Sequence, residues 1–109
     1  MSDEGDRIRA LRRMLERRPD DARLRFGLAL EHLSRGETAE GVRHLREYLE
    51  RADDEGNAWG RLGAALLELG RRDEARRAYE RGVEQAERHG HPTMAEEFKA
   101  ILEEWEGTG

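Results

Sequence analysis

Cysteine is missing from the sequence of 109 residues. Its absence excludes a disulfide framework, a thiol nucleophile and a cysteine-ligated zinc or iron–sulfur centre. It leaves the redox compartment open and is compatible with the cytosol. The function classes that depend on a thiolate are therefore set aside.

Long hydrophobic runs are missing too. No stretch of the sequence reaches the roughly 18 apolar residues that a membrane-spanning helix requires. The start of the chain, Met1 to Asp6, is polar and lacks the apolar segment of a secretion signal. We therefore expect a cytoplasmic protein without a membrane partner.

The sequence also has no excess of positive charge. Its formal net charge is -5, and 41% of its residues are charged. A general nucleic-acid binder would carry a basic footprint, so a nucleic-acid partner is not expected. The charges are of both signs and the apolar residues recur periodically, which favours a folded core over a disordered chain.

What the sequence does contain is a period of 34 residues, which separates Leu11, Leu45 and Tyr79. This is the length of one helix-turn-helix repeat, so the period predicts an all-α array of antiparallel helix pairs. Gly36 and Gly70 are spaced by the same period. Each is expected to provide the left-handed exit of a helix.

Apolar spacing and helix-ending residues predict about six helices. Ile8, Leu11 and Leu15 recur at i, i+3 and i+7, which is the spacing of an amphipathic helix. Pro19 is expected to end this helix, because proline cannot continue the hydrogen-bond ladder. Pro92 suits the first turn of the last helix.

The best-formed repeat combines a tryptophan, a glycine and an aromatic residue at fixed offsets. Its pattern consists of Trp59, Leu62, Gly63, Leu66, Gly70, Ala75 and Tyr79. This pattern resembles the tetratricopeptide repeat. Leu66, Gly82 and Glu87 depart from the tyrosine, alanine and proline that are usual in that family.

The resemblance implies a single domain over residues 1–109, built as a superhelix of antiparallel helix-turn-helix repeats. Within it, the N-terminal half-repeat helix covers 6–18 and a degenerate repeat covers 21–53. The well-formed repeat covers 55–88, and a C-terminal capping helix covers 92–106.

Close packing of such helices needs small residues where the backbones approach each other. The residues expected at these positions are Gly41, Gly63, Ala75 and Gly82. Glycine inside a helix costs about 1 kcal/mol relative to alanine, so the packing around it must compensate.

The resemblance also implies a binding surface, because the first helices of successive repeats line a concave groove in this family. By register, the groove residues are Arg23, Phe26, Leu30, Leu33, Asn57, Gly60, Arg61, Ala64 and Leu67. Phe26 and Leu30 stand where some family members carry the lysine and asparagine of a carboxylate clamp, so this clamp is not expected. The implied function is a non-catalytic interaction module that binds an apolar or amphipathic segment of a protein or peptide partner.

Two alternatives to this groove remain open. The first and last helices could fold over the surface and make Phe26 and Leu30 ordinary core, or a second copy of the chain could cover it in a homodimer. Gly27 and Gly60 show no packing need in the sequence, so they could allow a partner backbone to approach closely.

Residues for catalysis or metal binding are sparse. His89 and His91 are the only closely spaced histidines, and their i, i+2 spacing lacks a further fixed ligand. His32 is expected near a core position and His44 at the surface. Neither a catalytic residue, a metal ligand nor a cofactor is therefore assigned, and a metal- or ligand-dependent accessory protein is kept as a remote alternative.

Overall fold

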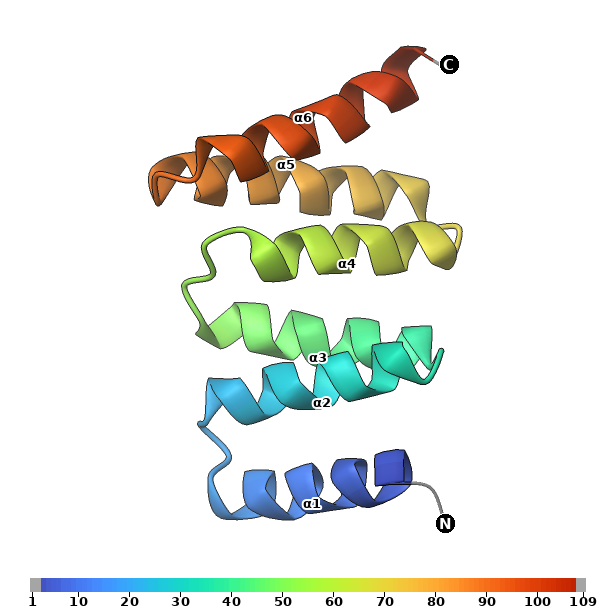
Figure 1. Ribbon diagram of the computed structural model, residues 1–109, viewed down its shortest axis with the longest axis vertical. Helices are drawn as coiled ribbons and strands as arrows, with labels where there is room; N and C mark the ends of the chain where they lie inside the picture. The colour runs from blue at the N-terminus through green and yellow to red at the C-terminus, as the bar shows by residue number, and fades with distance from the viewer. Residues whose placement is uncertain (1–2, 108–109) are drawn as a thin grey trace. The chain divides into compact units, whose positions relative to one another are not determined.

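The computed structural model describes residues 3–107, with side chains described over 5–105. These residues form six helices, α1 (Asp3–Arg17), α2 (Ala22–Ser34), α3 (Thr38–Arg51), α4 (Asn57–Glu68), α5 (Arg72–Arg88) and α6 (Pro92–Gly107) (Figure 1). The predicted all-α class is confirmed. Among these described helices, none has the length and apolar character needed to cross a membrane.

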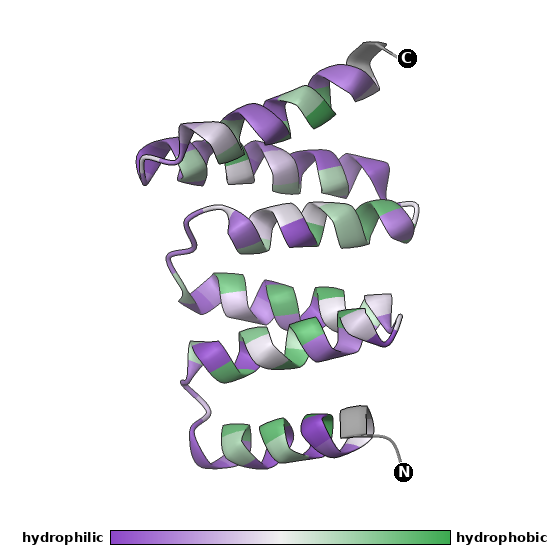
Figure 2. Cartoon of the chain, in the orientation of Figure 1, coloured by the Kyte–Doolittle hydropathy of each residue, from purple (hydrophilic) through white to green (hydrophobic). Residues whose placement is uncertain are grey.

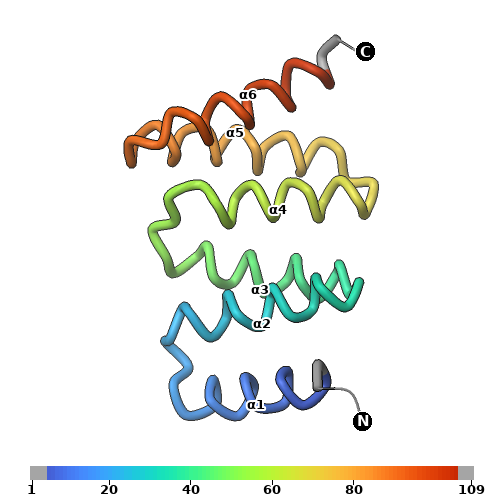
Figure 3. Tube along the Cα trace, viewed as in Figure 1, coloured from blue at the N-terminus to red at the C-terminus, as the bar shows by residue number. Residues whose placement is uncertain are grey.

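The chain divides into two compact units, Met1–Ala52 and Asp53–Gly109. Unit 1 comprises α1, α2 and α3, and unit 2 comprises α4, α5 and α6. Within each unit the chain reverses direction from one helix to the next, and consecutive helices pack against each other (Figure 3). The single domain predicted over residues 1–109 stays a prediction.

Three helices end in the same hydrogen-bonded cap. After α2, the N–H of Gly36 donates to the carbonyl of Leu33 and the N–H of Glu37 donates to the carbonyl of His32. This is the Schellman arrangement, in which the residue after the cap adopts a left-handed conformation. The φ angles of Gly36, Gly70 and Gly90 are 77°, 75° and 76°, so the exits predicted at Gly36 and Gly70 are confirmed.

A buried aspartate organises the start of α4. One carboxylate oxygen of Asp54 accepts hydrogen bonds from the backbone N–H groups of Gly56 and Ala58, both at 2.9 Å. Helix N-termini leave such donors unpaired, and an aspartate oxygen satisfies them. Gly56 has a φ of 127°, and a Cβ atom there would lie 2.8 Å from the sulfur of Met94, so this tight turn requires glycine.

In unit 1, the core lies between α2 and α3. Leu28, Ala29, Val42 and Leu45 are buried there. The two helices approach closely at Gly41, where an added Cβ atom would lie 2.5 Å from the side chain of Leu33. The small residue predicted at this position is therefore confirmed by its packing.

In unit 2, two aromatic rings lie on glycines. Tyr79 of α5 lies against Gly63 of α4, and Phe98 of α6 lies against Gly82 of α5. These contacts confirm the small residues predicted at Gly63 and Gly82, and the small residue predicted at Ala75 is fully buried. Figure 2 shows that hydrophilic residues alternate with hydrophobic ones along α5, as expected for a helix with one buried side.

A matched pair of glycine substitutions separates packing from helix propensity. In Gly63→Ala the new Cβ atom would lie 2.6 Å from the buried Tyr79 ring, whereas in Gly27→Ala it would lie at an ordinary 3.6 Å from Leu11. We expect Gly63→Ala to lower the free energy of unfolding by about 1–3 kcal/mol, as overpacking does. Gly27→Ala should raise it by up to about 1 kcal/mol through helix propensity. Urea unfolding followed by circular dichroism measures both, and destabilisation of equal size would contradict this packing.

The Asp54 cap gives a second prediction. Asp54→Ala removes both hydrogen bonds to the start of α4, so we expect a loss of about 1–2 kcal/mol in the free energy of unfolding. Asp54→Asn keeps an acceptor oxygen and should recover most of the loss. Asp53→Ala is the control, because Asp53 is exposed and its ion pairs lie at the surface. If thermal unfolding shows the two alanine variants to be equally stable, the cap does not stabilise α4.

Candidate functional site

The predicted groove residues on α2 are mostly half-buried within unit 1. Arg23 is exposed, whereas Phe26, Leu30 and Leu33 are each partly covered. The Phe26 ring centre lies 4.9 Å from the ring centre of Tyr48 on α3. Leu33 packs on Gly41, which is also on α3. Much of the apolar stripe on α2 is therefore used in packing against α3.

The predicted groove residues on α4 are more open. Asn57, Arg61, Ala64 and Leu67 are exposed, and Leu67 has a relative exposure of 41%. Gly60 differs from them, because a Cβ atom there would lie 2.5 Å from the Phe98 ring of α6. The interpretation that Gly60 has no packing need was wrong: the glycine makes room for this ring. A Cβ atom on Gly27 would lie 3.6 Å from the Leu11 side chain, which is an ordinary contact distance, so the packing does not require glycine at this position.

Two histidines meet inside unit 1. His32 of α2 and His44 of α3 are 3% and 6% exposed, their ring centres lie 5.2 Å apart and their planes differ by 6°. The core position expected for His32 is confirmed, but the surface position expected for His44 was wrong. His44 points toward α2 because it lies one helical turn from the buried Gly41.

Hydrogen bonding orients the His32 ring. Its Nδ1 lies 2.9 Å from Oε1 of Glu37. Because a carboxylate oxygen only accepts, Nδ1 carries the proton of this hydrogen bond, and in this tautomer Nε2 holds the lone pair. Nε2 is buried and has no hydrogen-bond partner among the described residues.

The His44 ring contacts the side chain of Arg43, its neighbour on α3. Nη2 of Arg43 donates to Oε2 of Glu40 at 2.8 Å and lies 3.3 Å from Nε2 of His44. Burial lowers the pKa of His44, and the charge of Arg43 lowers it further. The hydrogen bond from Arg43 lowers the pKa of Glu40. The cluster thus combines a neutral imidazole with an ionised carboxylate at neutral pH.

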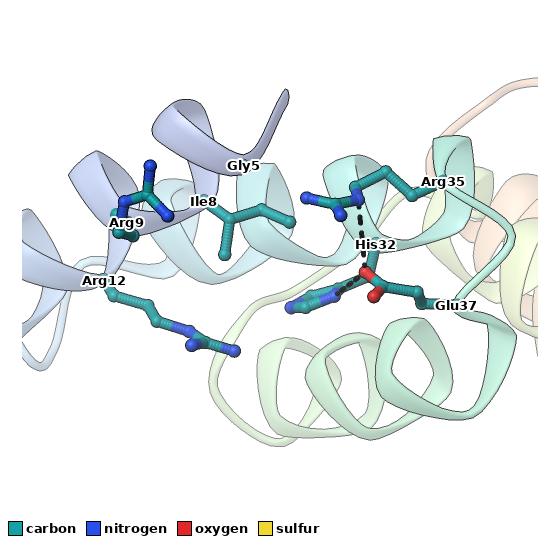
Figure 4. A pocket seen from close by; sticks show the side chains of 7 residues that line it. All are labelled: Gly5, Ile8, Arg9, Arg12, His32, Arg35 and Glu37. Atoms are coloured by element: carbon teal, nitrogen blue, oxygen red, sulfur yellow. Dashed lines mark hydrogen bonds and ion pairs between the residues drawn. The ribbon is translucent and has the colours of Figure 1, made fainter. Parts of the chain in front are cut away.

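A polar recess opens beside His32 in unit 1. Its volume is about 350 Å³, and its lining residues are Gly5, Ile8, Arg9, Arg12, His32, Arg35 and Glu37. In Figure 4 the His32 ring edge opposite Glu37 is directed toward the space between Ile8 and Arg12. Glu37 also lies 3.6 Å from Nε of Arg35. The His32 side chain therefore forms part of the wall of this recess.

His89 and His91 are the closely spaced histidines that the sequence analysis considered for metal binding. Both have carboxylate neighbours in unit 2. Nε2 of His91 lies 3.0 Å from Oε1 of Glu55, and Nε2 of His89 lies 3.4 Å from Asp53. The hydrogen bond with His91 lowers the pKa of Glu55. These contacts join the turn before α6 to the segment before α4.

The histidine–carboxylate cluster of unit 1 is the feature that sequence reasoning missed. Glu40 and His44 are four residues apart, so they share one face of α3 and the spacing alone pairs them. His32 joins them only through the packing of α2 on α3. No local pattern in the sequence brings it there.

Comparisons with known proteins give one consistent answer. The tetratricopeptide repeat family profile matches residues 32–92. A TPR repeat-containing protein of Pseudomonas aeruginosa is 32% identical over 95 residues, which are 87% of this chain and 90% of that protein. The solution structure of protein BPP2914 from Bordetella parapertussis superposes with a TM-score of 0.74 at 29% identity, covering 89% of this chain and 84% of that one.

Proposed function

The chain belongs to the tetratricopeptide repeat family, and on that premise we propose that it is a non-catalytic module that binds an apolar or amphipathic segment of a partner protein. Proteins of this family generally mediate protein–protein interactions and are typically scaffolds without catalytic activity. The proposed ligand is an apolar or amphipathic segment, and its proposed main contacts are exposed residues of α4.

The observation that carries the proposal is the outward face of α4. Asn57, Arg61, Ala64 and Leu67 recur at i, i+4, i+7 and i+10, so they lie along one side of the helix, and all four are exposed. Leu67 is one of two large hydrophobic residues that are exposed within the described part of the chain. A leucine beside a small alanine offers an apolar contact with room for a partner side chain.

The α2 residues support the same ligand chemistry. Phe26 and Leu30 keep part of their surface accessible, and neither can donate a hydrogen bond to a terminal carboxylate. An apolar side chain is the better match for these surfaces. Within unit 2, Arg61 of α4 is exposed and adds a preference for acidic groups in the partner.

Self-association is the second candidate, because the same exposed Leu67 could pack against a second copy of the chain. A homodimer would bury this leucine without a separate partner. The two candidates differ in one measurable property, namely whether the purified protein alone forms a dimer whose stability depends on Leu67.

The test selects peptides from a random displayed library and measures their affinity for purified variants. We expect Leu67→Glu to weaken the selected peptides by about tenfold or more, since burying a leucine contributes roughly 1.5–3 kcal/mol. Met14→Glu is the matched control. Met14 is the other exposed large hydrophobic residue, 47% exposed, but it lies on α1 and outside the predicted groove. Its substitution should leave the affinity unchanged.

Three outcomes would contradict the proposal. The library could yield no specific peptide, Leu67→Glu could leave the affinity unchanged, or Met14→Glu could weaken binding as much as Leu67→Glu. Sedimentation of the wild type over a range of concentrations then decides the second candidate. A dimer that Leu67→Glu converts into a folded monomer would establish self-association.

A further inference from the structure

Three side chains of unit 1 have the chemistry and the spacing of metal ligands. Glu40 and His44 lie four residues apart on α3, and His32 faces them from α2. Their ligand atoms, a carboxylate oxygen and one nitrogen from each ring, all lie within 4.8 Å of one another. Two of these side chains share one face of α3 and the third comes from the adjacent α2. Because all three are carried by helices, their relative positions are well fixed.

Among the described residues, Nε2 of His32 has no hydrogen-bond partner. The Nδ1–H group donates to Oε1 of Glu37 with an N···O distance of 2.9 Å, which leaves Nε2 buried and without a hydrogen bond. A buried polar atom without a partner costs free energy, so its presence calls for a ligand or another compensation. A carboxylate that fixes the opposite ring nitrogen is also the usual outer-shell partner of a metal-binding histidine.

The lone pairs of Glu40 and His44 already converge on a cation. Nη2 of Arg43 lies 2.8 Å from Oε2 of Glu40 and 3.3 Å from Nε2 of His44. Because a guanidinium only donates, both neighbours direct acceptor atoms at the same point. The Arg43 side chain is 53% exposed, so it can swing into solvent and release that point to another cation.

We propose that His32, Glu40 and His44 bind a divalent transition-metal ion such as Zn²⁺. Imidazole suits Zn²⁺, and a set of two histidines and one glutamate leaves a fourth tetrahedral position for water. Zinc–ligand bonds of about 2.0–2.1 Å place tetrahedral ligand atoms roughly 3.3 Å apart. The cluster must therefore contract. The Glu40 side chain is 47% exposed and can move, and the two buried, stacked imidazole rings must also turn toward the ion.

The ion would join α2 to α3 and would stabilise the helix pair of unit 1. It could exchange with solvent through the recess beside His32, which is lined by Arg9 and Arg12 among others. The proposal does not depend on partner binding by α4. The His89 and His91 pair serves as an internal comparison, because its carboxylate neighbours Asp53 and Glu55 are near the ring nitrogens in an exposed setting.

The experiment titrates Zn²⁺ into the full chain prepared without a histidine tag, using calorimetry, and repeats the titration with Co²⁺ to record its visible absorption. The test variant is Glu40→Gln, which keeps the size of an exposed side chain and removes its charge, so folding is retained. His32→Asn and His44→Asn remove the buried ligands. The control is the double variant His89→Asn/His91→Asn. Circular dichroism without metal establishes that each variant is folded.

We expect one Zn²⁺ per chain, affinity at least tenfold weaker in Glu40→Gln, and unchanged affinity in the His89/His91 control. The Co²⁺ complex should show the strong visible bands of a low-coordinate site, and Zn²⁺ should raise the thermal midpoint of the wild type. The proposal is overturned if no stoichiometric uptake occurs, if Glu40→Gln binds as tightly as the wild type, or if uptake is lost in the His89/His91 control. One ion per two chains would overturn it as well. If a buried histidine variant does not fold, Glu40→Gln still decides.

Discussion

The packing of a side chain from one helix directly onto a glycine of the next is the constraint on which both units depend. A Cβ atom on Gly41 would lie 2.5 Å from Leu33, and one on Gly63 would lie 2.6 Å from Tyr79. Neither position can accept a side chain without displacing a packed neighbour. Each glycine gives up helix propensity of about 1 kcal/mol, and the dispersion contacts that it permits offset this loss.

This constraint determines which surfaces of the helices remain exposed. The Phe98 ring of α6 lies over Gly60 and Gly82, so that side of α4 is used inside unit 2. The side that carries Arg61 and Leu67 is exposed. A repeat helix packs with one stripe and leaves another for a ligand, because its side chains project in all directions around the axis.

The interior of unit 1 departs from this apolar pattern. Two histidines are buried there, and burial without full hydrogen bonding is unfavourable. The nearby charges of Glu37 and Arg43 compensate in part. Departures from local rules concentrate at functional or strained positions, which is why this cluster is a stronger candidate for chemistry than the exposed pair His89 and His91.

The sequence by itself determined the helices, the exits at Gly36 and Gly70 and the small residues at the contacts, because periodicity and backbone sterics act over neighbouring residues. The spacing of Glu40 and His44 also places them on one helix face, but no site was predicted from it. Only the tertiary structure decided that His44 is buried, that His32 lies beside it and that Phe98 covers Gly60. These facts depend on how far one helix is rotated about its axis relative to the next. Side-chain packing between helices sets that rotation, and no local pattern encodes it.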